Sequence, residues 1–291
     1  MKDVFIGMGG WMLPGFEGKF YPDGAGKGFR KLEYYSRFFD MVEVNATFYT
    51  LALSPRQVGR WVTDVSGNSD FMFTVKLFQD FTHKRTAGAR EAKIVHEMLE
   101  PLMRPDKLGG LVLQFPHSFL CTNENRNYLA ALSKLFSSFV LFLEVRHDSW
   151  NQPDMFRFFQ DQHFHLVNVD LPAIKRHMPL TNEVWGGSGY LRLMGRNKAS
   201  WDSGSVQQRY NYSYSAGELE DFVKRIESLR GVAQKTFVVF HNDPNAHSAV
   251  NGFQLKHLLK PAERIGVPQS LIKSFPDLQS FAANAHSDKF S

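Results

Sequence analysis

One segment of the chain reads Val140-Leu141-Phe142-Leu143-Glu144-Val145-Arg146, a short apolar run that ends with charged residues. Apolar runs of this length are typical of strands buried on both faces, as in a parallel sheet. Similar runs recur along the chain and predict eight buried strands in all, at residues 4–7, 42–45, 71–77, 110–115, 140–145, 165–170, 190–194 and 236–241.

Segments with helical signals separate most of these strands. Ser54-Pro55 is typical of an N-cap followed by proline in the first turn. Ser215 and Glu218 form a capping-box pattern ahead of an amphipathic run. The sixth connection, residues 171–188, has weak periodicity, and we expect a crossover helix there as in the other connections.

The regular alternation of strands and helices predicts the α/β class and one (β/α)₈ TIM barrel over residues 1–291. We expect a flexible C-terminal tail from about residue 275. A doubly wound sheet is the alternative. It is disfavoured because Gly7-Met8-Gly9-Gly10-Trp11, which follows the first strand, is not a GxGxxG turn and leads into a long loop.

Composition narrows the class of protein. The 291 residues include 34 Lys and Arg against 29 Asp and Glu, a formal charge of +5 that weakly favours anionic partners. The single cysteine, Cys121, excludes an intrachain disulfide and favours a reducing cytoplasm. The N-terminus lacks a signal-peptide pattern, and the apolar runs are too short to span a membrane. We therefore expect a soluble, cytoplasmic protein with no membrane partner.

Almost every predicted strand ends with a charged or amide side chain. In a barrel these ends meet at the C-terminal face, where active sites lie. The side chains concerned are Glu43, Asn45, Lys76, Gln114, Glu144, Arg146, Asp170, Arg192, His241 and Asn242. A purely structural ring of three acids and three bases is unfavourable, because desolvation often exceeds the Coulombic gain. A functional site is therefore favoured.

The residue types suggest roles in that site. Glu43, Glu144 and Asp170 are candidates for proton transfer if burial raises their pKa values. Lys76 is a further catalytic candidate, more as a point charge than as a Schiff-base nucleophile, because a lysine beside carboxylates stays protonated. The predicted substrate-binding residues are Arg146 and Arg192, which suit a carboxylate or phosphate, together with Asn45, Gln114, His83, Trp11, Tyr49 and Asn242.

Two alternatives stay open. Glu43, Glu144, Asp170 and His241 could hold a divalent metal, although cations in the same ring would compete for the carboxylates; no other cofactor is predicted. The segment 197–214 interleaves basic and aromatic residues that could stack on nucleic-acid bases or pack over the barrel. These residues are Lys198, Trp201, Arg209, Tyr210, Tyr212 and Tyr214.

Motifs along nearly the whole chain resemble those of domain-of-unknown-function family 72, the YecE-like family. They are Ile6-Gly7-x-Gly9-Gly10-Trp11, Phe20-Tyr21-Pro22, Val42-Glu43-Val44-Asn45-x-Thr47-Phe48-Tyr49, Phe73-Thr74-Val75-Lys76, Thr82-His83, Leu113-Gln114-Phe115-Pro116-x-x-Phe119, Leu143-Glu144-Val145-Arg146-His147-x-Ser149-Trp150, Val167-Asn168-Val169-Asp170-x-Pro172, Tyr190-Leu191-Arg192-Leu193-x-Gly195, Tyr212-x-Tyr214-Ser215 and Asn242-Asp243. The resemblance implies a TIM barrel and no established reaction. Met194 and His241 depart from the family pattern, in which histidine and asparagine are common at these positions.

Three functions are compatible with these observations. The first is a hydrolase, isomerase or lyase that acts by acid–base chemistry on a small polar, anionic or sugar-like substrate. The second is a metal-dependent phosphodiesterase or endonuclease-like enzyme acting on nucleic acid, and the third is a non-catalytic ligand-binding barrel. The sequence indicates neither the substrate nor the oligomeric state.

Overall fold

The computed structural model of the chain describes residues 3–201 and 205–283. Its eight strands close into one parallel barrel in sequence order, which confirms the predicted fold class. The strands are β1 Val4–Met8, β2 Met41–Val44, β3 Met72–Lys76, β4 Leu108–Gln114, β5 Leu141–Glu144, β6 Phe164–Asp170, β7 Ser188–Leu193 and β8 Lys235–Phe240. Each lies within two residues of its predicted bounds, and the largest differences are at the starts of β4 and β7.

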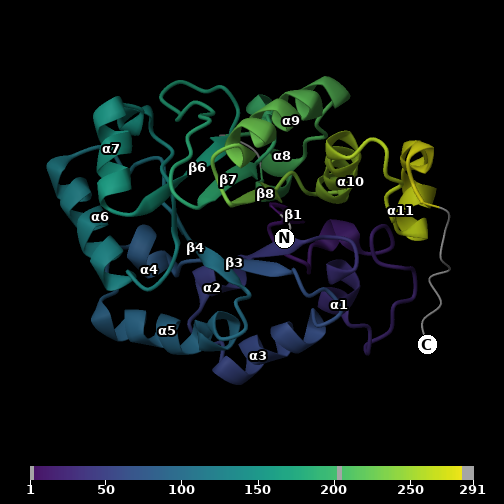
Figure 1. Cartoon of the computed structure of the whole chain (residues 1–291), viewed down its shortest axis with the longest axis horizontal. Coiled ribbons are helices and arrows are strands. Elements are labelled where there is room, and N and C mark those ends of the chain that lie inside the picture. Colours follow the sequence, from purple (N-terminus) through teal and green to yellow (C-terminus); the bar gives the residue numbers. More distant parts are fainter. Residues whose placement is uncertain (1–2, 202–204, 284–291) are drawn as a thin grey trace.

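Helices surround this barrel, and Figure 1 shows α3 and α5 on one side of the strands and α9 on the opposite side. The α-helices are α1 Lys31–Ser36, α2 Ala46–Tyr49, α3 Pro55–Asp64, α4 Gln79–Thr82, α5 Ala89–Met103, α6 Asn123–Leu135, α7 Pro153–Asp161, α8 Val206–Tyr210, α9 Ala216–Arg230, α10 His247–Leu259 and α11 Gln269–Ser274. Within residues 3–201 and 205–283, no helix is long and apolar enough to cross a membrane.

The two predicted helix starts are confirmed. The Ser54 side chain accepts a hydrogen bond from the Gln57 amide, and the Gln57 side chain accepts one from the Ser54 amide, at the start of α3. Ser215 and Glu218 form the same reciprocal pair at the start of α9. Such a cap contributes about 1 kcal/mol because it satisfies amides that have no partner within the helix.

The sixth connection differs from the prediction. The described segment between β6 and β7 contains no helix, so the crossover helix expected at residues 171–188 is wrong. Pro172 and Pro179 interrupt this segment, and proline removes a backbone donor that a helix needs. Asn168, on the outer side of β6, holds the segment instead: its Nδ2 donates to the Glu183 carbonyl (2.9 Å), and its Oδ1 accepts from the Glu183 amide (2.8 Å).

The barrel interior is filled by alternate residues of the strands. Near its middle, the Tyr190 ring lies 4.7 Å from the Phe142 ring and 5.9 Å from the Phe237 ring, measured between centroids. The buried members of this interior cluster are Phe5, Met41, Met72, Val112, Phe142, Val167, Val169, Tyr190, Met194, Trp201, Phe237 and Val239. This packed layer supports the charged side chains at the C-terminal end of the strands.

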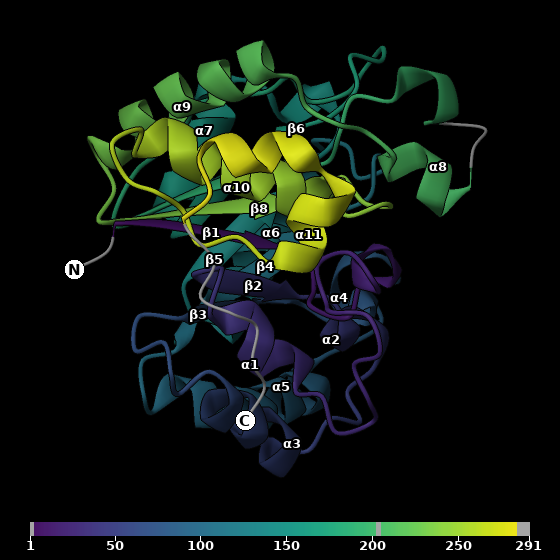
Figure 2. The same ribbon diagram turned by 90° about the vertical axis from the view of Figure 1, so that its right-hand side faces the viewer.

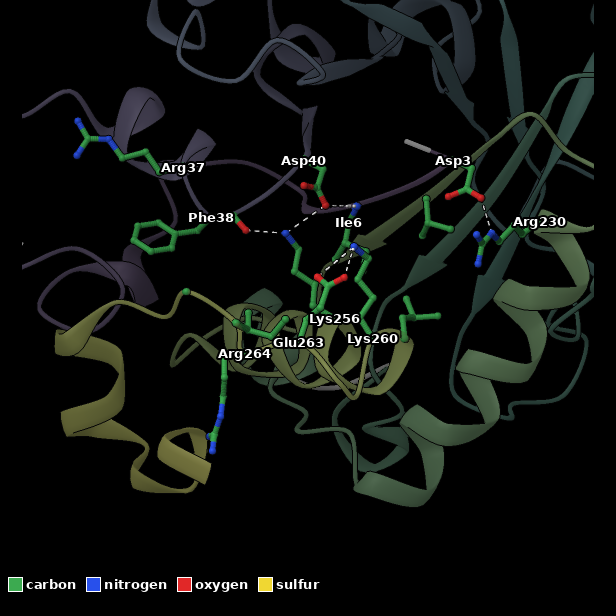
Figure 3. Close-up of a pocket in the computed structure, with 14 residues that line it drawn as sticks. Asp3, Ile6, Arg37, Phe38, Asp40, Arg230, Lys256, Lys260, Glu263 and Arg264 are labelled. Carbon is green, nitrogen blue, oxygen red and sulfur yellow. Dashed lines mark hydrogen bonds and ion pairs between the residues drawn. The ribbon is translucent and has the colours of Figure 1, made fainter. Parts of the chain in front are cut away.

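A cavity of about 640 Å³ lies at the opposite end of the barrel, where β1 begins (Figure 3). Ion pairs cross its walls. Arg230, at the end of α9, binds Asp3. Lys256 of α10 lies 3.1 Å from the Asp40 carboxylate and donates to the Phe38 carbonyl oxygen (2.7 Å). These contacts join α9 and α10 to the segments around the first two strands, as expected of the end of a barrel that serves stability.

The start of the predicted flexible tail is ordered and packed. Residues Pro276–Ser280 form a 3₁₀ helix, η4, and the side chains of Leu278 and Phe281 are buried. The Ala283 amide donates to the Ile265 carbonyl (2.7 Å), and Figure 2 shows α11 beside α10. The remainder of that tail, residues 284–291, lies outside the described residues.

Candidate functional site

Six of the predicted residues lie together at the C-terminal end of the barrel. Glu43 ends β2, Lys76 ends β3, and Arg192 lies in β7; Glu144 and Arg146 are the last residue of β5 and the second residue after it, and His241 directly follows β8. Figure 2 shows α2, α4 and α8 at this end, away from the N-terminus.

Arg192 bridges the two glutamates in the buried part of the site. Its Nη2 donates to Glu43 Oε1 (2.8 Å), and its Nη1 donates to Glu144 Oε2. The side chains of both glutamates are fully buried, and that of Arg192 is 2% exposed. Arg192 Nε also donates to His241 Nε2 (3.1 Å). We call Glu43, Arg192 and Glu144 the buried triad.

Two neighbours of the buried triad were missed by the sequence analysis. The Tyr190 hydroxyl donates to Glu43 Oε2 (2.8 Å) and lies 2.9 Å from Thr74 Oγ1, which is then the donor to the tyrosine oxygen. Strand alternation could have identified both, because Tyr190 is two residues from Arg192 and Thr74 is two residues from Lys76. These bonds fix the orientation of the Glu43 carboxylate.

The buried carboxylates are ionised, contrary to the expectation that burial would raise their pKa values. Burial alone acts in that direction, but Arg192 and His241 outweigh it and hold the pKa of Glu43 well below its usual range. Arg192 and Arg146 likewise outweigh burial and lower the pKa of Glu144 to about 2. At neutral pH these groups supply fixed negative charge rather than protons.

Lys76 is placed by α2, which follows β2. The Thr47 hydroxyl donates to the Lys76 carbonyl oxygen (2.7 Å), and the ring of Phe48 lies 4.0 Å from the Lys76 amine. Within the described residues, no hydrogen bond or ion pair to this amine is found. The side chain therefore approaches the site with its nitrogen unpaired.

The pKa of Lys76 is lowered to about 7. Burial contributes most, and the positive charges of Arg192 and Arg146 add to it, while the two carboxylates act in the opposite direction. The direction of this shift is opposite to the expectation that the carboxylates keep the lysine protonated. Both carboxylates are already bound by arginine, so their attraction for the ammonium form is offset and burial dominates.

Arg146 and His83 form the outer part of the site. Arg146 Nε donates to Glu144 Oε1 (2.8 Å), and its side chain is 18% exposed. Among the described residues, its Nη1 and Nη2 have no partner. The His83 ring lies 4.9 Å from the Phe48 ring. Partial burial, followed by the charges of Lys76 and Arg146, lowers the pKa of His83 to about 4, so its imidazole is neutral.

Two further predicted residues lie beside this cluster. Gln114 is buried next to Glu144 in the β4–β5 register, and its Nε2 donates to the Phe115 carbonyl (2.7 Å). Tyr49 is 71% exposed at the end of α2, and its ring lies 5.0 Å from that of Phe48. Both remain candidates for substrate binding.

Asn45 and Trp11 hold the loop after β1. Asn45 Nδ2 donates to the Gly9 carbonyl (2.7 Å), and the Trp11 ring packs edge-on against Trp61 of α3 at 5.5 Å. A Cβ at Gly9 would lie 2.3 Å from His241 Nδ1, so only glycine lets this loop approach the imidazole so closely.

Asp170, a predicted catalytic residue, lies outside the cluster. Val167 and Val169 belong to the interior cluster, so strand alternation turns Asp170 to the outer side of β6. There its carboxylate receives Arg196 Nη2 (2.8 Å) and Nε (2.9 and 3.0 Å) and the Tyr214 hydroxyl (2.7 Å). Asp170 joins the segment after β7 to the barrel.

Replacing Asp170 with asparagine should lower the free energy of unfolding by about 2 kcal/mol, because charged hydrogen bonds of a buried group are lost. Ligand binding at the cluster should not change. Urea unfolding and a binding titration of the same variant measure the two effects. If the variant had normal stability but had lost ligand binding, Asp170 would be part of the functional site after all.

Asn242 also points away from the cluster. Its fully buried side chain donates to the Tyr212 carbonyl (2.9 Å) and to Asn251 Oδ1 (2.8 Å) in α10. Asn242, a predicted substrate-binding residue, thus connects the segment after β7 with α10.

The predicted metal ligands do not form a metal site. Asp170 lies on the outer side of β6, and the carboxylates of Glu43 and Glu144 are occupied by Arg192. Within residues 3–201 and 205–283, no group of three or more His, Cys, Asp or Glu side chains is arranged to hold a metal ion. The donor set present does not fit a divalent cation.

The aromatic residues of 197–214 pack against the protein. Trp201 is 7% exposed and belongs to the interior cluster, with the guanidinium of Arg209 at 5.7 Å from its ring. The Tyr212 hydroxyl donates to Glu218 (2.7 Å), and Tyr214 binds Asp170. The packing alternative is favoured over a base-stacking platform; residues 202–204 of this segment lie outside the described part.

The two departures from the family pattern lie in different surroundings. Met194 is buried in the interior cluster beside the top of β7. His241 is inside the site, where burial and Arg192 lower its pKa and Glu43 opposes them. Its Nε2 lies 3.1 Å from Arg192 Nε and 3.1 Å from Glu43 Oε1.

Comparisons with known proteins agree with the motif resemblance. A solved structure of a DUF72 family protein (TM1631) from Thermotoga maritima MSB8 is 28% identical, with a TM-score of 0.80 over 89% of this chain and 100% of that one. A DUF72 family protein (EF0366) from Enterococcus faecalis V583 is 25% identical, with a TM-score of 0.78 over 88% of this chain and 95% of that one.

Sequence comparison gives the same result. The UPF0759 protein YunF of Bacillus subtilis (strain 168) is 31% identical over 276 residues, which cover 88% of this chain and 94% of that protein. The family model described as "Protein of unknown function DUF72" matches residues 5–273. Since this match spans nearly the whole barrel, the chain belongs to the DUF72 family.

Proposed function

We propose that this protein is an enzyme that acts by acid–base chemistry on a small polar, anionic or sugar-like substrate, with Lys76 as the group that exchanges the proton. The observation that carries the proposal is the unpaired Lys76 amine, whose pKa of about 7 suits a proton-transfer group at neutral pH. Such perturbed groups at the C-terminal end of a barrel are typical of active sites.

The surroundings of Lys76 support this role. In its neutral form the amine can accept a proton from the substrate, and the ionised Glu43 and Glu144 then stabilise the ammonium that forms. The two Nη atoms of Arg146 are suited to bind a carboxylate or phosphate on the substrate. An isomerase or a lyase needs this combination of a base and an anion anchor; a hydrolase would need an activated water in addition.

The two other functions have less support. Nucleic-acid cleavage by a bound metal is disfavoured because the predicted metal ligands are separated and the aromatic segment is packed. A non-catalytic binding barrel does not require an unpaired lysine with a lowered pKa. A cytoplasmic location remains part of the proposal and is based on the single free cysteine, Cys121.

Arg146→Gln is expected to weaken the binding of anionic ligands by ten- to a hundredfold, because charged hydrogen bonds contribute about 1.5–3 kcal/mol. Thermal-shift titrations with hydroxy acids and sugar phosphates measure the effect. Arg157→Gln, at an exposed position of α7, is the matched control and should leave affinity unchanged.

The same compounds then separate an enzyme from a binding protein. We expect Lys76→Met to retain the ligands but to lose their turnover, whereas Lys93→Met, at an exposed position of α5, should retain both. Ligand binding by the native protein without turnover of any bound compound would contradict the proposal and favour the non-catalytic barrel.

A further inference from the structure

Among the described residues of the site, the Lys76 amine differs from the other charged groups because it has neither a hydrogen bond nor an ion pair. Arg192 binds both carboxylates of the buried triad, and Arg146 Nε binds Glu144 as well. The ring of Phe48 covers one side of the amine at 4.0 Å. The Lys76 residue is nevertheless partly exposed, at the C-terminal end of the barrel.

We propose that Lys76 forms a covalent imine with its substrate, and that the substrate class is a small aldehyde or ketone that carries a carboxylate or a phosphate. This inference rests on the proposed function of the same site and adds the identity of the reacting group. An unpaired lysine beside other cations and an aromatic ring is the arrangement in which a lysine serves as a nucleophile towards carbonyl carbon.

The reaction balances without an oxidant, a reductant or a cofactor. The nitrogen lone pair of the neutral amine attacks the carbonyl carbon, and the carbonyl π electrons move to oxygen, which takes up one proton from the nitrogen and a second from solvent. The carbon–oxygen bond then breaks and water leaves. Counted from the ammonium form, one carbonyl compound is consumed and one water is released, and the positive charge ends on the protonated imine.

The charges around Lys76 favour both the neutral amine that reacts and the protonated imine that forms. Arg192 and Arg146 favour the neutral, nucleophilic amine, and burial acts in the same direction on its pKa. After the imine forms, the ionised Glu43 and Glu144 act favourably on its positive charge. The free Nη atoms of Arg146 select a carbonyl compound that bears an anionic group.

Reductive trapping tests this inference. The protein is incubated at pH 7 with dihydroxyacetone phosphate, pyruvate or uncharged dihydroxyacetone in the presence of cyanoborohydride, and adducts are located by peptide mass spectrometry. We expect an adduct on Lys76, formed at least tenfold faster with dihydroxyacetone phosphate than with dihydroxyacetone. Arg146→Gln should remove this difference, and Lys76→Arg, which retains the positive charge, should give no adduct at this position.

The exposed Lys93 provides the internal control. Adducts that form on Lys93 as fast as on Lys76, or no adduct on Lys76 with any probe, would overturn the imine. If Lys76 gives no adduct while Lys76→Met still loses turnover, the imine is excluded and the acid–base proposal stands. If the substitution also leaves turnover unchanged, both proposals are wrong.

Discussion

Arg192→Leu is expected to lower the free energy of unfolding by about 3–5 kcal/mol, because it leaves the buried Glu43 without its arginine and removes one of the two arginines that bind the buried Glu144. Glu43 and Glu144 are both fully buried, and each receives one nitrogen of the Arg192 guanidinium. Urea unfolding at pH 7 measures the change. A loss below about 1 kcal/mol would be typical of an exposed ion pair and would contradict the buried triad.

The pH dependence of this variant provides a second readout. In the native protein the pKa of Glu144 is about 2, below its unfolded value, so its contribution to stability is present above pH 4.5 and is lost as the pH falls towards 2. Without Arg192, burial should raise the pKa of Glu43, whereas at Glu144 Arg146 continues to oppose it. Acidification from pH 7 to pH 5 should then reduce the stability difference between variant and native protein.

A charge-neutral variant provides the matched control. Arg192→Leu combined with Glu43→Gln and Glu144→Gln removes the uncompensated charges and keeps side chains of similar volume. It should recover much of the lost stability, since neutral replacements of a buried ion pair are often tolerated. If the triple variant were as unstable as Arg192→Leu alone, packing rather than charge would explain the loss.

The fold could be predicted from the sequence because strand burial and helix capping are local signals. Each apolar run marks a strand with few competing interpretations, and Ser54 and Ser215 mark helix starts through bonds to nearby residues. The helix in the sixth connection was predicted wrongly because it was expected by analogy with the other connections, although residues 171–188 have weak helical periodicity. Asn168 replaces that helix with side-chain bonds whose partners lie 15 residues away.

The candidate site was predicted in part. Strand ends identified Glu43, Glu144 and Arg192, but the alternation of side chains was not applied to β6, and Asp170 was therefore assigned to the wrong side. Its partner Arg196 follows the next strand, so their bidentate pair depends on tertiary structure.

The charge state of Lys76 could not be derived from the sequence either. It depends on which cation binds which carboxylate, and the structure assigns both carboxylates to arginine. A list of three acids and three bases is compatible with several pairings. In most of them Lys76 would be paired and fully protonated.

The lowered pKa of Lys76 should also affect stability. Because this pKa is about 7 in the folded protein and about 10.5 in the unfolded chain, the unfolded state binds more protons between these values. The contribution of Lys76 to stability therefore increases as the pH rises through this window. Lys76→Met should stabilise the protein below pH 7 and remove this slope, whereas an ion-paired lysine would show the reverse.

Competitive acetylation reports directly on the Lys76 amine. Trace acetic anhydride modifies only neutral amines, so the modified fraction of each lysine, followed from pH 5 to pH 11 by peptide mass spectrometry, reports its titration. Lys224 is the internal reference, because Asp221 holds its pKa above the ordinary value. In the Arg146→Gln variant the Lys76 midpoint should move to higher pH, since one of the cations that lowers it is lost.

The Lys76 amine should be neutral in a large fraction of the molecules at physiological pH, and this titration tests that property most directly. We predict half-maximal acetylation of Lys76 near pH 7, while Lys224 stays largely unmodified until far higher pH. A Lys76 midpoint at about 10.5 would show an ordinary protonated lysine and would contradict the account.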